Sequence, residues 1–205
     1  MPNTMTDLLP PIQSNPTMSA MDAIHQRRSV RNYEQQSIGK VTVNALLNAA
    51  VLAPTAMHQE PWSFVVIQDK SVLDRLSDST KNMIRDEVKG SASSSAKQTL
   101  HHVANPEFHV FYNAGTLIII CGNHTGPFVE ADCWLAAENL MLAACAKGLG
   151  TCVIGFAVEA LNTAEWKAEL NIPKEMTVIA PIIVGVPASD TAATSRKPPE
   201  ILLWK

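Results

Sequence analysis

The spacing of apolar positions predicts three helices in the first part of the chain. Ser19 and Asp22 form the pattern of a capping box and mark the start of a short helix. In a second helix apolar side chains recur every three or four positions; Thr42 is its expected cap and Pro54 ends it. These apolar positions are Val43, Leu46, Leu47, Ala50 and Val51. Residues 71–85 are expected to form a third, amphipathic helix.

Apolar runs predict β-strands over residues 62–67, 116–121, 151–156 and 178–186. The run 116–121 is almost continuously apolar, which is typical of a strand that is buried on both faces of a sheet. A further helix is expected over residues 164–170. Helices and strands are interleaved, but too irregularly for a simple series of β-α-β units.

The helix predicted over residues 131–147 is apolar on nearly every side. Its apolar residues include Trp134, Leu135, Leu140, Met141, Leu142, Ala143 and Ala144. Such a helix belongs in the middle of a core or in an interface between subunits. Gly148 and Gly150 then end it, and a left-handed cap is expected there.

Length and composition indicate a single globular domain. The chain has 205 residues, of which 46% are hydrophobic and 17% are charged, so a substantial core is expected. Residues 1–18 show no period and are expected to form an N-terminal arm, which leaves the domain over residues 19–205. Residues 90–95, rich in Ser and Ala after Gly90, are expected to form a flexible joint.

The net charge and the positions of the cysteines limit which partners and which cellular compartment are expected. The net charge of -3 and the pI near 6.1 argue against a nucleic-acid partner, which would require a basic face. No apolar run is long enough to span a bilayer. The four cysteines, at positions 121, 133, 145 and 152, lack the spacing of a zinc site and are predicted to be mostly buried free thiols. A cytoplasmic protein without a membrane partner is therefore expected.

The most distinctive chemistry lies in residues 27–31, which hold three arginines and a serine. Arg27, Arg28 and Arg31 carry planar cations that can grip phosphate oxygens bidentately, and Ser29 adds a hydroxyl donor. Because the rest of the chain is only mildly charged, this is a local concentration of positive charge. One interpretation is an anion site. The other is a solvated basic end of the first helix, where Arg also suits the helix dipole.

Two common nucleotide-binding devices are missing: no G-x-G-x-x-G turn follows a first strand, and no Walker A lysine loop occurs. Instead, four sequence blocks resemble those of the nitroreductase family of flavin mononucleotide (FMN) enzymes and occur in the order found in that family. They are residues 27–31, residues 53–62, residues 148–156, and residues 185–187 with 196–200. The resemblance covers about residues 19–205. It implies an α+β, nitroreductase-like fold with a central mixed or antiparallel sheet flanked by helices, and an intertwined homodimer with one FMN at each of two interface sites.

The resemblance assigns residues 27–31 to the cofactor. Arg27 and Ser29 match residues that contact the phosphate and ribityl oxygens, and Arg28 belongs to the same block. Arg31 matches a cation at the pyrimidine edge of the ring. A fixed cation there favours the anionic reduced flavin and so raises its potential.

Two later positions also match cofactor contacts of the family. Arg196, with Lys197 beside it, stands where the family places a second phosphate-binding arginine; the alternative is a tail residue that only keeps the C-terminus soluble. Ile154 and Gly155 match the place where a backbone amide approaches flavin N5, and Gly allows such a close approach. The alternative is a β-bulge or a strand end at a packed corner.

Pro54, Thr55 and His58 match the loop that lies against the flavin in the family, partly from the partner subunit. The commoner form of this loop has Ser, Asn and Gln at the positions of Thr55, His58 and Glu60. Thr55 keeps the hydroxyl, whereas His58 and Glu60 change the charge beside the ring. The alternative is an ordinary connection between a helix and a strand.

No metal site is expected, because the histidines at positions 101, 102, 109 and 124 have no carboxylate at ligand spacing. In the family this middle region helps to cover the active site. Phe108, Phe111 and Tyr112 are therefore candidates for shaping substrate choice.

The activity that the resemblance implies is ping-pong hydride transfer. NAD(P)H would deliver hydride to flavin N5, and a nitroaromatic, a quinone or a similar electron-poor acceptor would then be reduced. No catalytic side chain is required, because the flavin carries the chemistry. Two alternatives stay open: an FMN-binding protein or redox sensor that does not turn over, and a relative with another flavin reaction, such as dehalogenation, enoate reduction or flavin breakdown.

Overall fold

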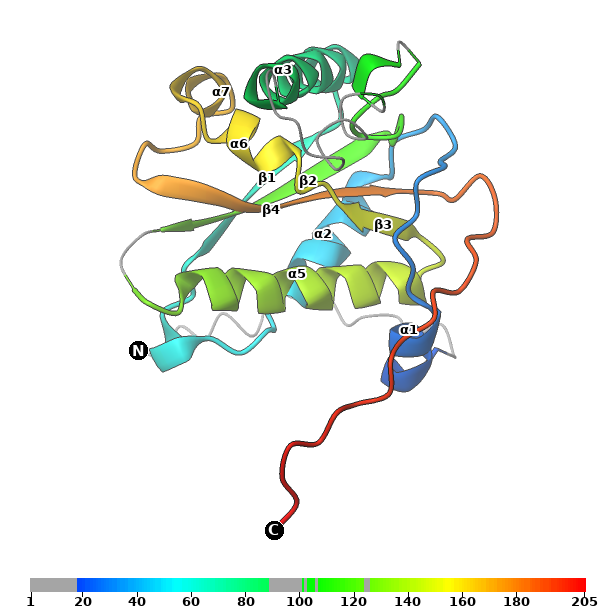
Figure 1. The fold of residues 1–205 in the computed structure, drawn as a ribbon. Helices are drawn as coiled ribbons and strands as arrows, with labels where there is room; N and C mark the ends of the chain where they lie inside the picture. Colours follow the sequence, from blue (N-terminus) through cyan, green and yellow to red (C-terminus); the bar gives the residue numbers. More distant parts are fainter. Residues whose placement is uncertain (1–17, 89–100, 102, 106, 124–125) are drawn as a thin grey trace.

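The structure is a computed structural model that describes residues 18–88, 101, 103–105, 107–123 and 126–205. Its centre is one sheet of four antiparallel strands in the order β1-β2-β4-β3 (Figure 1). The strands are β1 (Trp62–Ile67), β2 (Thr116–Asn123), β3 (Gly150–Val153) and β4 (Met176–Gly185). Apart from Met18, the predicted arm lies outside the described residues, as do the predicted joint at 90–95 and the histidines at 102 and 124.

Helices cover both faces of the sheet (Figure 1). On one face lie α3 (Lys70–Val88), α6 (Ala157–Leu161) and α7 (Ala164–Glu169). On the other lie α2 (Lys40–Ala50) and α5 (Val129–Ala146), with α1 (Ala20–Gln26) packed on α5 and the short 3-10 helix η2 (Ala56–His58) after α2. This arrangement confirms the predicted α+β fold with a sheet flanked by helices.

Alternation of side chains along β2 builds a core on each side of the sheet. Leu117 and Ile119 belong to the cluster under α3, α6 and α7, whereas Ile118 and Ile120 belong to the cluster under α2 and α5. All four side chains are completely buried. The prediction of a strand buried on both faces is thus confirmed.

The predictions for the start of α2 and for the end of β3 are wrong. α2 begins directly after Gly39, so Thr42 lies inside the helix and caps nothing. β3 ends at Val153 rather than 156, because the chain turns there and starts α6. This five-residue helix is too short to show a period in the sequence. The capping box of α1 is confirmed: the backbone amide of Asp22 donates to Ser19 Oγ (3.1 Å), and the amide of Ser19 donates to Asp22 (3.1 Å).

α5 buries one side against the sheet and leaves the other open. The buried residues include Cys133, Ala136, Ala137, Leu140, Met141 and Ala144. On the opposite side Trp134 is 40% exposed and Leu135 is 46% exposed. The helix is therefore only half covered by its own chain.

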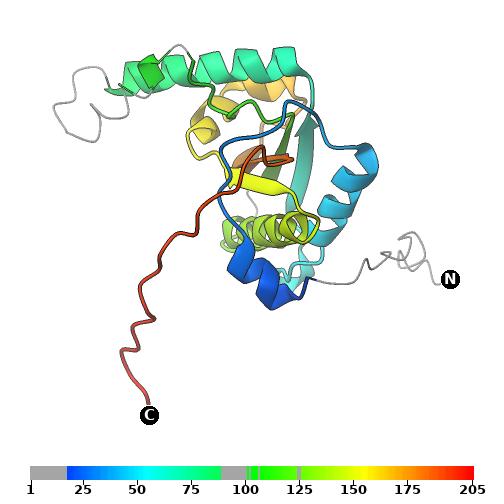
Figure 2. The same cartoon turned by 90° about the vertical axis from the view of Figure 1, so that its right-hand side faces the viewer.

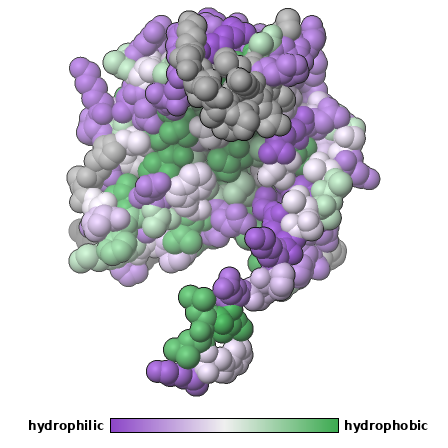
Figure 3. All heavy atoms as spheres, in the orientation of Figure 1, coloured by the Kyte–Doolittle hydropathy of each residue, from purple (hydrophilic) through white to green (hydrophobic). Residues whose placement is uncertain are grey.

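Beyond β4 the chain leaves the domain as an extended tail (Figure 2). Every residue over 188–205 is exposed. The end of the tail is apolar, with Ile201, Leu202, Leu203 and Trp204, and forms a separate hydrophobic tip (Figure 3).

All four cysteines are free, and three of them are buried as predicted: Cys121, Cys133 and Cys152. Burial raises the pKa of Cys121 to about 11 and that of Cys133 to about 12, so neither is a thiolate at neutral pH. Among the helices of the described residues, none combines the length and the apolarity that crossing a membrane requires.

Candidate functional site

Residues 29–31 are fixed beside β3. The backbone amide of Val30 donates to the carbonyl of Thr151 (2.9 Å). The Val30 side chain is buried against Gly150, where a Cβ atom would lie only 2.7 Å from a Val30 methyl group. Because successive side chains of an extended chain point to opposite sides, Ser29 and Arg31 are turned away from this core contact. Both are exposed.

Four of the predicted site residues meet around one cavity of about 520 Å³, named here the arginine cavity. Its lining includes Arg27, Arg28, Ser29, Glu138 and Arg196. The first three follow α1, whereas Arg196 comes from the C-terminal tail and Glu138 from α5. A cavity with three guanidinium groups is suited to a multiply charged anion.

The contacts of Arg27 and Arg28 differ. Arg28 Nη1 donates to the carbonyls of His25 (2.6 Å) and Arg27 (2.9 Å), which are the contacts of a side chain that caps the end of α1. Arg27 Nε lies 3.5 Å from the carboxylate of Glu138, which is about half exposed. Residues 27–31 were interpreted either as an anion site or as the basic end of the first helix, and the two interpretations apply to different arginines. Arg28 supports the helix end, and Arg27 places a positive charge at the cavity.

A second cavity of about 240 Å³, named the Arg31 cavity, includes Arg31, Tyr112, Ile154, Gly155 and Phe156 in its lining. The guanidinium carbon of Arg31 lies 6.0 Å from the centroid of the Tyr112 ring. Gly155 is exposed, and a Cβ atom there would meet no atom within 4 Å. The cavity is therefore open in front of Gly155, so a flat ligand can approach its backbone.

Ile154 and Gly155 have different roles in this corner. The amide of Ile154 donates to the carbonyl of Pro181 (2.8 Å), and its side chain is buried. The amide of Gly155 takes part in none of the backbone hydrogen bonds between described residues. Of the two predicted amides, that of Gly155 is the one available to a ligand.

The loop with Pro54, Thr55 and His58 lies elsewhere and lines neither cavity. The amide of Ala56 donates to the carboxylate of Asp132 (3.2 and 3.3 Å), which is buried in the first turn of α5. Since an α-helix rises 1.5 Å per residue, Asp132 is about 9 Å along α5 from the level of Glu138 at the arginine cavity. Within one chain, the structure does not bring this loop to the other predicted site residues.

The same loop has unusual backbone angles. Met57, His58 and Glu60 have φ values of 54°, 53° and 45°, in the left-handed region that residues other than Gly rarely adopt. The Met57 side chain is 85% exposed. Strain of this kind clusters at sites that bind ligands or partners.

One residue of the arginine cavity was not predicted from the sequence, and one predicted residue does not line it. Glu138 was not singled out, and its only signal is a carboxylate within a strongly apolar helix. Lys197 is exposed in the tail and does not line the arginine cavity, whereas its neighbour Arg196 does.

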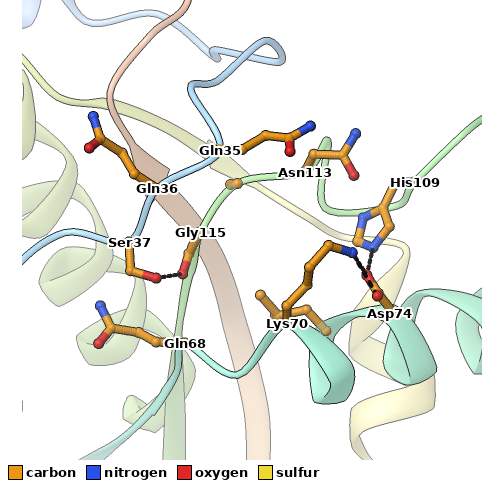
Figure 4. Close-up of a pocket in the computed structure, with 11 residues that line it drawn as sticks. Gln35, Gln36, Ser37, Gln68, Lys70, Asp74, His109, Asn113 and Gly115 are labelled. Atoms are coloured by element: carbon orange, nitrogen blue, oxygen red, sulfur yellow. Dashed lines mark hydrogen bonds and ion pairs between the residues drawn. The ribbon is translucent and has the colours of Figure 1, made fainter.

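A third, smaller cavity of about 150 Å³ lies between the start of α3 and residues 109–115 (Figure 4). Asp74 pairs there with Lys70 (2.7 Å) and with His109 (3.2 Å). Burial lowers the pKa of His109, and Asp74 acts in the opposite direction. Among the residues that the structure describes, no three His, Cys, Asp or Glu side chains are close enough to hold a metal ion.

Comparison with known proteins identifies the class. A sequence model of the nitroreductase family matches residues 24–186, and the chain therefore belongs to this family. A protein of Archaeoglobus fulgidus, named as a candidate NADH dehydrogenase/NAD(P)H nitroreductase, is 25% identical over 172 residues. The match covers 82% of this chain and 84% of the archaeal protein.

Solved structures show the same fold. A nitroreductase of Bacteroides fragilis with bound FMN has a TM-score of 0.78 and 24% identity, over 92% of this chain and 100% of that chain. An iodotyrosine deiodinase bound to FMN and 3-iodo-L-tyrosine has a TM-score of 0.73 and 20% identity, over 89% of this chain and 97% of that chain. At these identities the likeness establishes the fold, which is shared by proteins with different substrates.

Proposed function

We propose that this protein is an FMN-dependent oxidoreductase that uses NAD(P)H to reduce nitroaromatic, quinone or similar electron-poor acceptors. The observation that carries the proposal is a pair of cavities lined by the residues that precede and follow the buried Val30 in the chain. One cavity gathers Arg27, Ser29 and Arg196, and the other gathers Arg31 and Gly155. A ligand with a charged end and a flat end fits this arrangement.

The arginine cavity suits the phosphate of FMN. Arg27 and Arg196 supply guanidinium donors, and the exposed Ser29 supplies a hydroxyl. Arg28 holds the end of α1 and so keeps Arg27 in place, with its charge adding to the field. Charge-assisted hydrogen bonds of this kind contribute about 1.5–3 kcal/mol each.

The Arg31 cavity suits the flavin ring. We assign Arg31 to the pyrimidine edge, where a fixed cation would stabilise negative charge on the reduced ring. The open space before Gly155 admits a planar group, and the Gly155 amide is available as a donor to it. Ile154 supports this corner through its hydrogen bond to Pro181.

When bound, FMN would supply the redox chemistry, which is hydride transfer from NAD(P)H to the acceptor in a ping-pong cycle. The side chains of this chain bind and orient the cofactor and set its electrostatic surroundings. No side chain is assigned as a catalytic acid or base.

The active unit is proposed to be a homodimer. Apolar side chains are exposed on α1, on α5 and on the loop after α2, and these three elements lie on the same side of the sheet (Figure 1). They are Met21, Ile24, Leu52, Met57, Trp134 and Leu135. Exposed apolar patches of this kind are typical of protein interfaces. A partner covering this side would bring its own Pro54, Thr55 and His58 toward the cofactor.

The free thiols are consistent with a reducing compartment, and we assign the protein to the cytoplasm.

The decisive experiment is purification followed by mass analysis of the released cofactor and anaerobic titration with NADH and NADPH in parallel. Stoichiometric FMN and bleaching by a nicotinamide are expected. Recovery of FAD, or of no flavin after reconstitution, contradicts the proposal. Reduced protein is then mixed with a nitroaromatic, a quinone and a halogenated phenol; reoxidation by the halogenated phenol alone would favour the dehalogenation alternative.

A further inference from the structure

A turn with unusual backbone geometry lies beside the Arg31 cavity. Tyr112 has a φ of 49° and Asn113 has a φ of 56°, both in the left-handed region. For a bulky aromatic residue this conformation is rare, and it persists only where the surrounding structure enforces it. The position of the Tyr112 side chain is therefore maintained against a local backbone preference.

Hydrogen bonds and a buried side chain hold this turn. The amide of Tyr112 donates to the carbonyl of His109 (2.8 Å), and the amide of Val110 donates to Ser77 Oγ on α3 (3.0 Å). Phe111, between them, is completely buried. The turn is thus part of the core on the α3 side of the sheet.

His109 ties the turn to α3 a second time (Figure 4). Its Nδ1 accepts from the amide of Phe111 (3.2 Å), and its Nε2 lies 3.2 Å from Asp74 Oδ1. Because Nδ1 accepts, the ring proton of the neutral form is on Nε2, which donates to Asp74. Both ring nitrogens therefore stabilise the turn.

The turn places the Tyr112 ring against Arg31, with 6.0 Å between the guanidinium carbon and the ring centroid. None of the ion pairs between described residues involves Arg31. Burial raises the pKa of the Tyr112 hydroxyl, whereas the charge of Arg31 and an interaction of the hydroxyl with the Arg31 side chain act in the opposite direction. The Tyr112 side chain, through its ring and its hydroxyl, is thus the group that restrains an otherwise exposed guanidinium.

We propose that Tyr112 is the positioning residue for Arg31: its ring holds the guanidinium at the pyrimidine edge of the flavin and thereby raises the reduction potential. This inference rests on the proposed function. A cation on a free side chain would spend part of its time in solvent, whereas a cation held over an aromatic face is fixed where charge develops. Tyr112 acts through Arg31 and not on the cofactor itself.

The test compares Tyr112→Leu, Tyr112→Phe, Arg31→Gln and the double variant Tyr112→Leu/Arg31→Gln, each reconstituted with FMN. The midpoint potential and the dissociation constant of oxidised FMN are measured for each protein. Tyr112→Leu should weaken binding of reduced FMN relative to oxidised FMN by about tenfold, which is about 30 mV for a two-electron couple. Tyr112→Phe keeps the ring but loses the hydroxyl that interacts with Arg31, so it should lower the potential less than Tyr112→Leu does.

The double variant separates positioning from direct contact. If Tyr112 acts through Arg31, Tyr112→Leu has no further effect on the potential once Arg31 is replaced. An equal shift in both backgrounds, or an unchanged potential in Tyr112→Leu, overturns the inference. Asn113→Gly is the matched control, because Gly accepts the same φ and because Asn113 lines the third cavity and not the Arg31 cavity. This variant should leave the potential unchanged.

Urea unfolding of the flavin-free proteins gives a readout that does not depend on the cofactor. The double variant should be no less stable than the less stable single variant, because both single substitutions remove the same contact. Additive losses of stability overturn the pairing. Failure of the wild type to take up FMN overturns the proposed function itself, and it is seen before any variant is made.

Discussion

Arg27 and Glu138 form an ion pair across the arginine cavity, with 3.5 Å between Arg27 Nε and Glu138 Oε1. The arginine follows α1, and the carboxylate comes from the middle of α5. A phosphate that enters this cavity therefore meets a cation that already has a counter-ion. The pair keeps Arg27 in place but places a negative charge near the ligand.

Glu138→Gln should therefore tighten FMN binding. The pair is partly exposed and screened by solvent, so the expected gain is about 0.2–1 kcal/mol, or up to about fivefold in affinity. Fluorescence titration measures the change, and it should shrink as the salt concentration rises. Glu165→Gln on α7 serves as the control for a general change in net charge. Weaker binding in Glu138→Gln alone would show that the carboxylate is needed to orient Arg27.

Replacing the guanidinium groups should weaken FMN binding without unfolding the protein. Arg27→Ala and Arg196→Ala are each expected to lose about 1.5–3 kcal/mol of binding free energy, at least tenfold in affinity. Lys197→Ala is the matched control, because Lys197 neighbours Arg196 but does not line the cavity. Equal effects of Arg196→Ala and Lys197→Ala would mean that the tail acts only through its overall charge.

The close contact between Gly150 and Val30 should tolerate no added side chain. In Gly150→Ala the new Cβ would lie 2.7 Å from Val30, and the resulting shift should cost about 1–3 kcal/mol of stability. Because Ser29 and Arg31 flank Val30, FMN affinity should fall as well. Gly39→Ala adds a methyl group where no atom lies within 4 Å and should leave affinity unchanged. Denaturant unfolding and flavin titration together check both effects.

Acid should destabilise the fold through His109. Burial lowers the pKa of this residue below its ordinary value of 6.5, so the unfolded chain binds the proton more readily than the folded protein. The stability associated with neutral His109 is therefore present above pH 6.5 and is lost as the pH falls from 6.5 toward the folded pKa. His109→Gln should flatten the stability profile in that window. A profile that keeps its slope in this variant would place the proton uptake elsewhere.

The exposed side of α5 should be required for assembly. Leu135→Asp would bury an unpaired carboxylate in the proposed interface, at a cost of several kcal/mol. Sedimentation should show a monomer that has lost its yellow colour, against a flavin-loaded dimer for the wild type. A folded monomer that retains FMN and full turnover would show that each site is complete within one chain.

Much of the fold could be predicted from the sequence because burial leaves a strong pattern. The apolar run of β2 and the helical period of α2 follow directly from which side chains face the core. The start of α2 was misassigned because Thr42 is a common capping residue, whereas the helix begins after Gly39 without a side-chain cap. α6 was missed because a helix of five residues contains too few turns to show a period.

The candidate site was less accessible to sequence reasoning because its contacts join distant segments. Arg196 lies near Arg27 only because the C-terminal tail runs past the arginine cavity. Glu138 contacts Arg27 from α5, which is distant in the sequence. Nothing local in the sequence shows that Asp132 holds the loop at Ala56, or that Tyr112 adopts a left-handed conformation beside Arg31. These features depend on how the packed elements face one another.

α5 carries both Glu138, at the arginine cavity, and Asp132, which anchors the loop at Ala56. In the proposed dimer that loop lies against the partner's cofactor. The helix α5 therefore connects the two cofactor sites. A ligand that orders Arg27 would also order α5 and, through Asp132, the loop at Ala56 of the same chain. That loop would then be stiffer where it meets the cofactor of the partner. The second FMN would then bind to a site that is already partly ordered, and the two binding events should be positively cooperative.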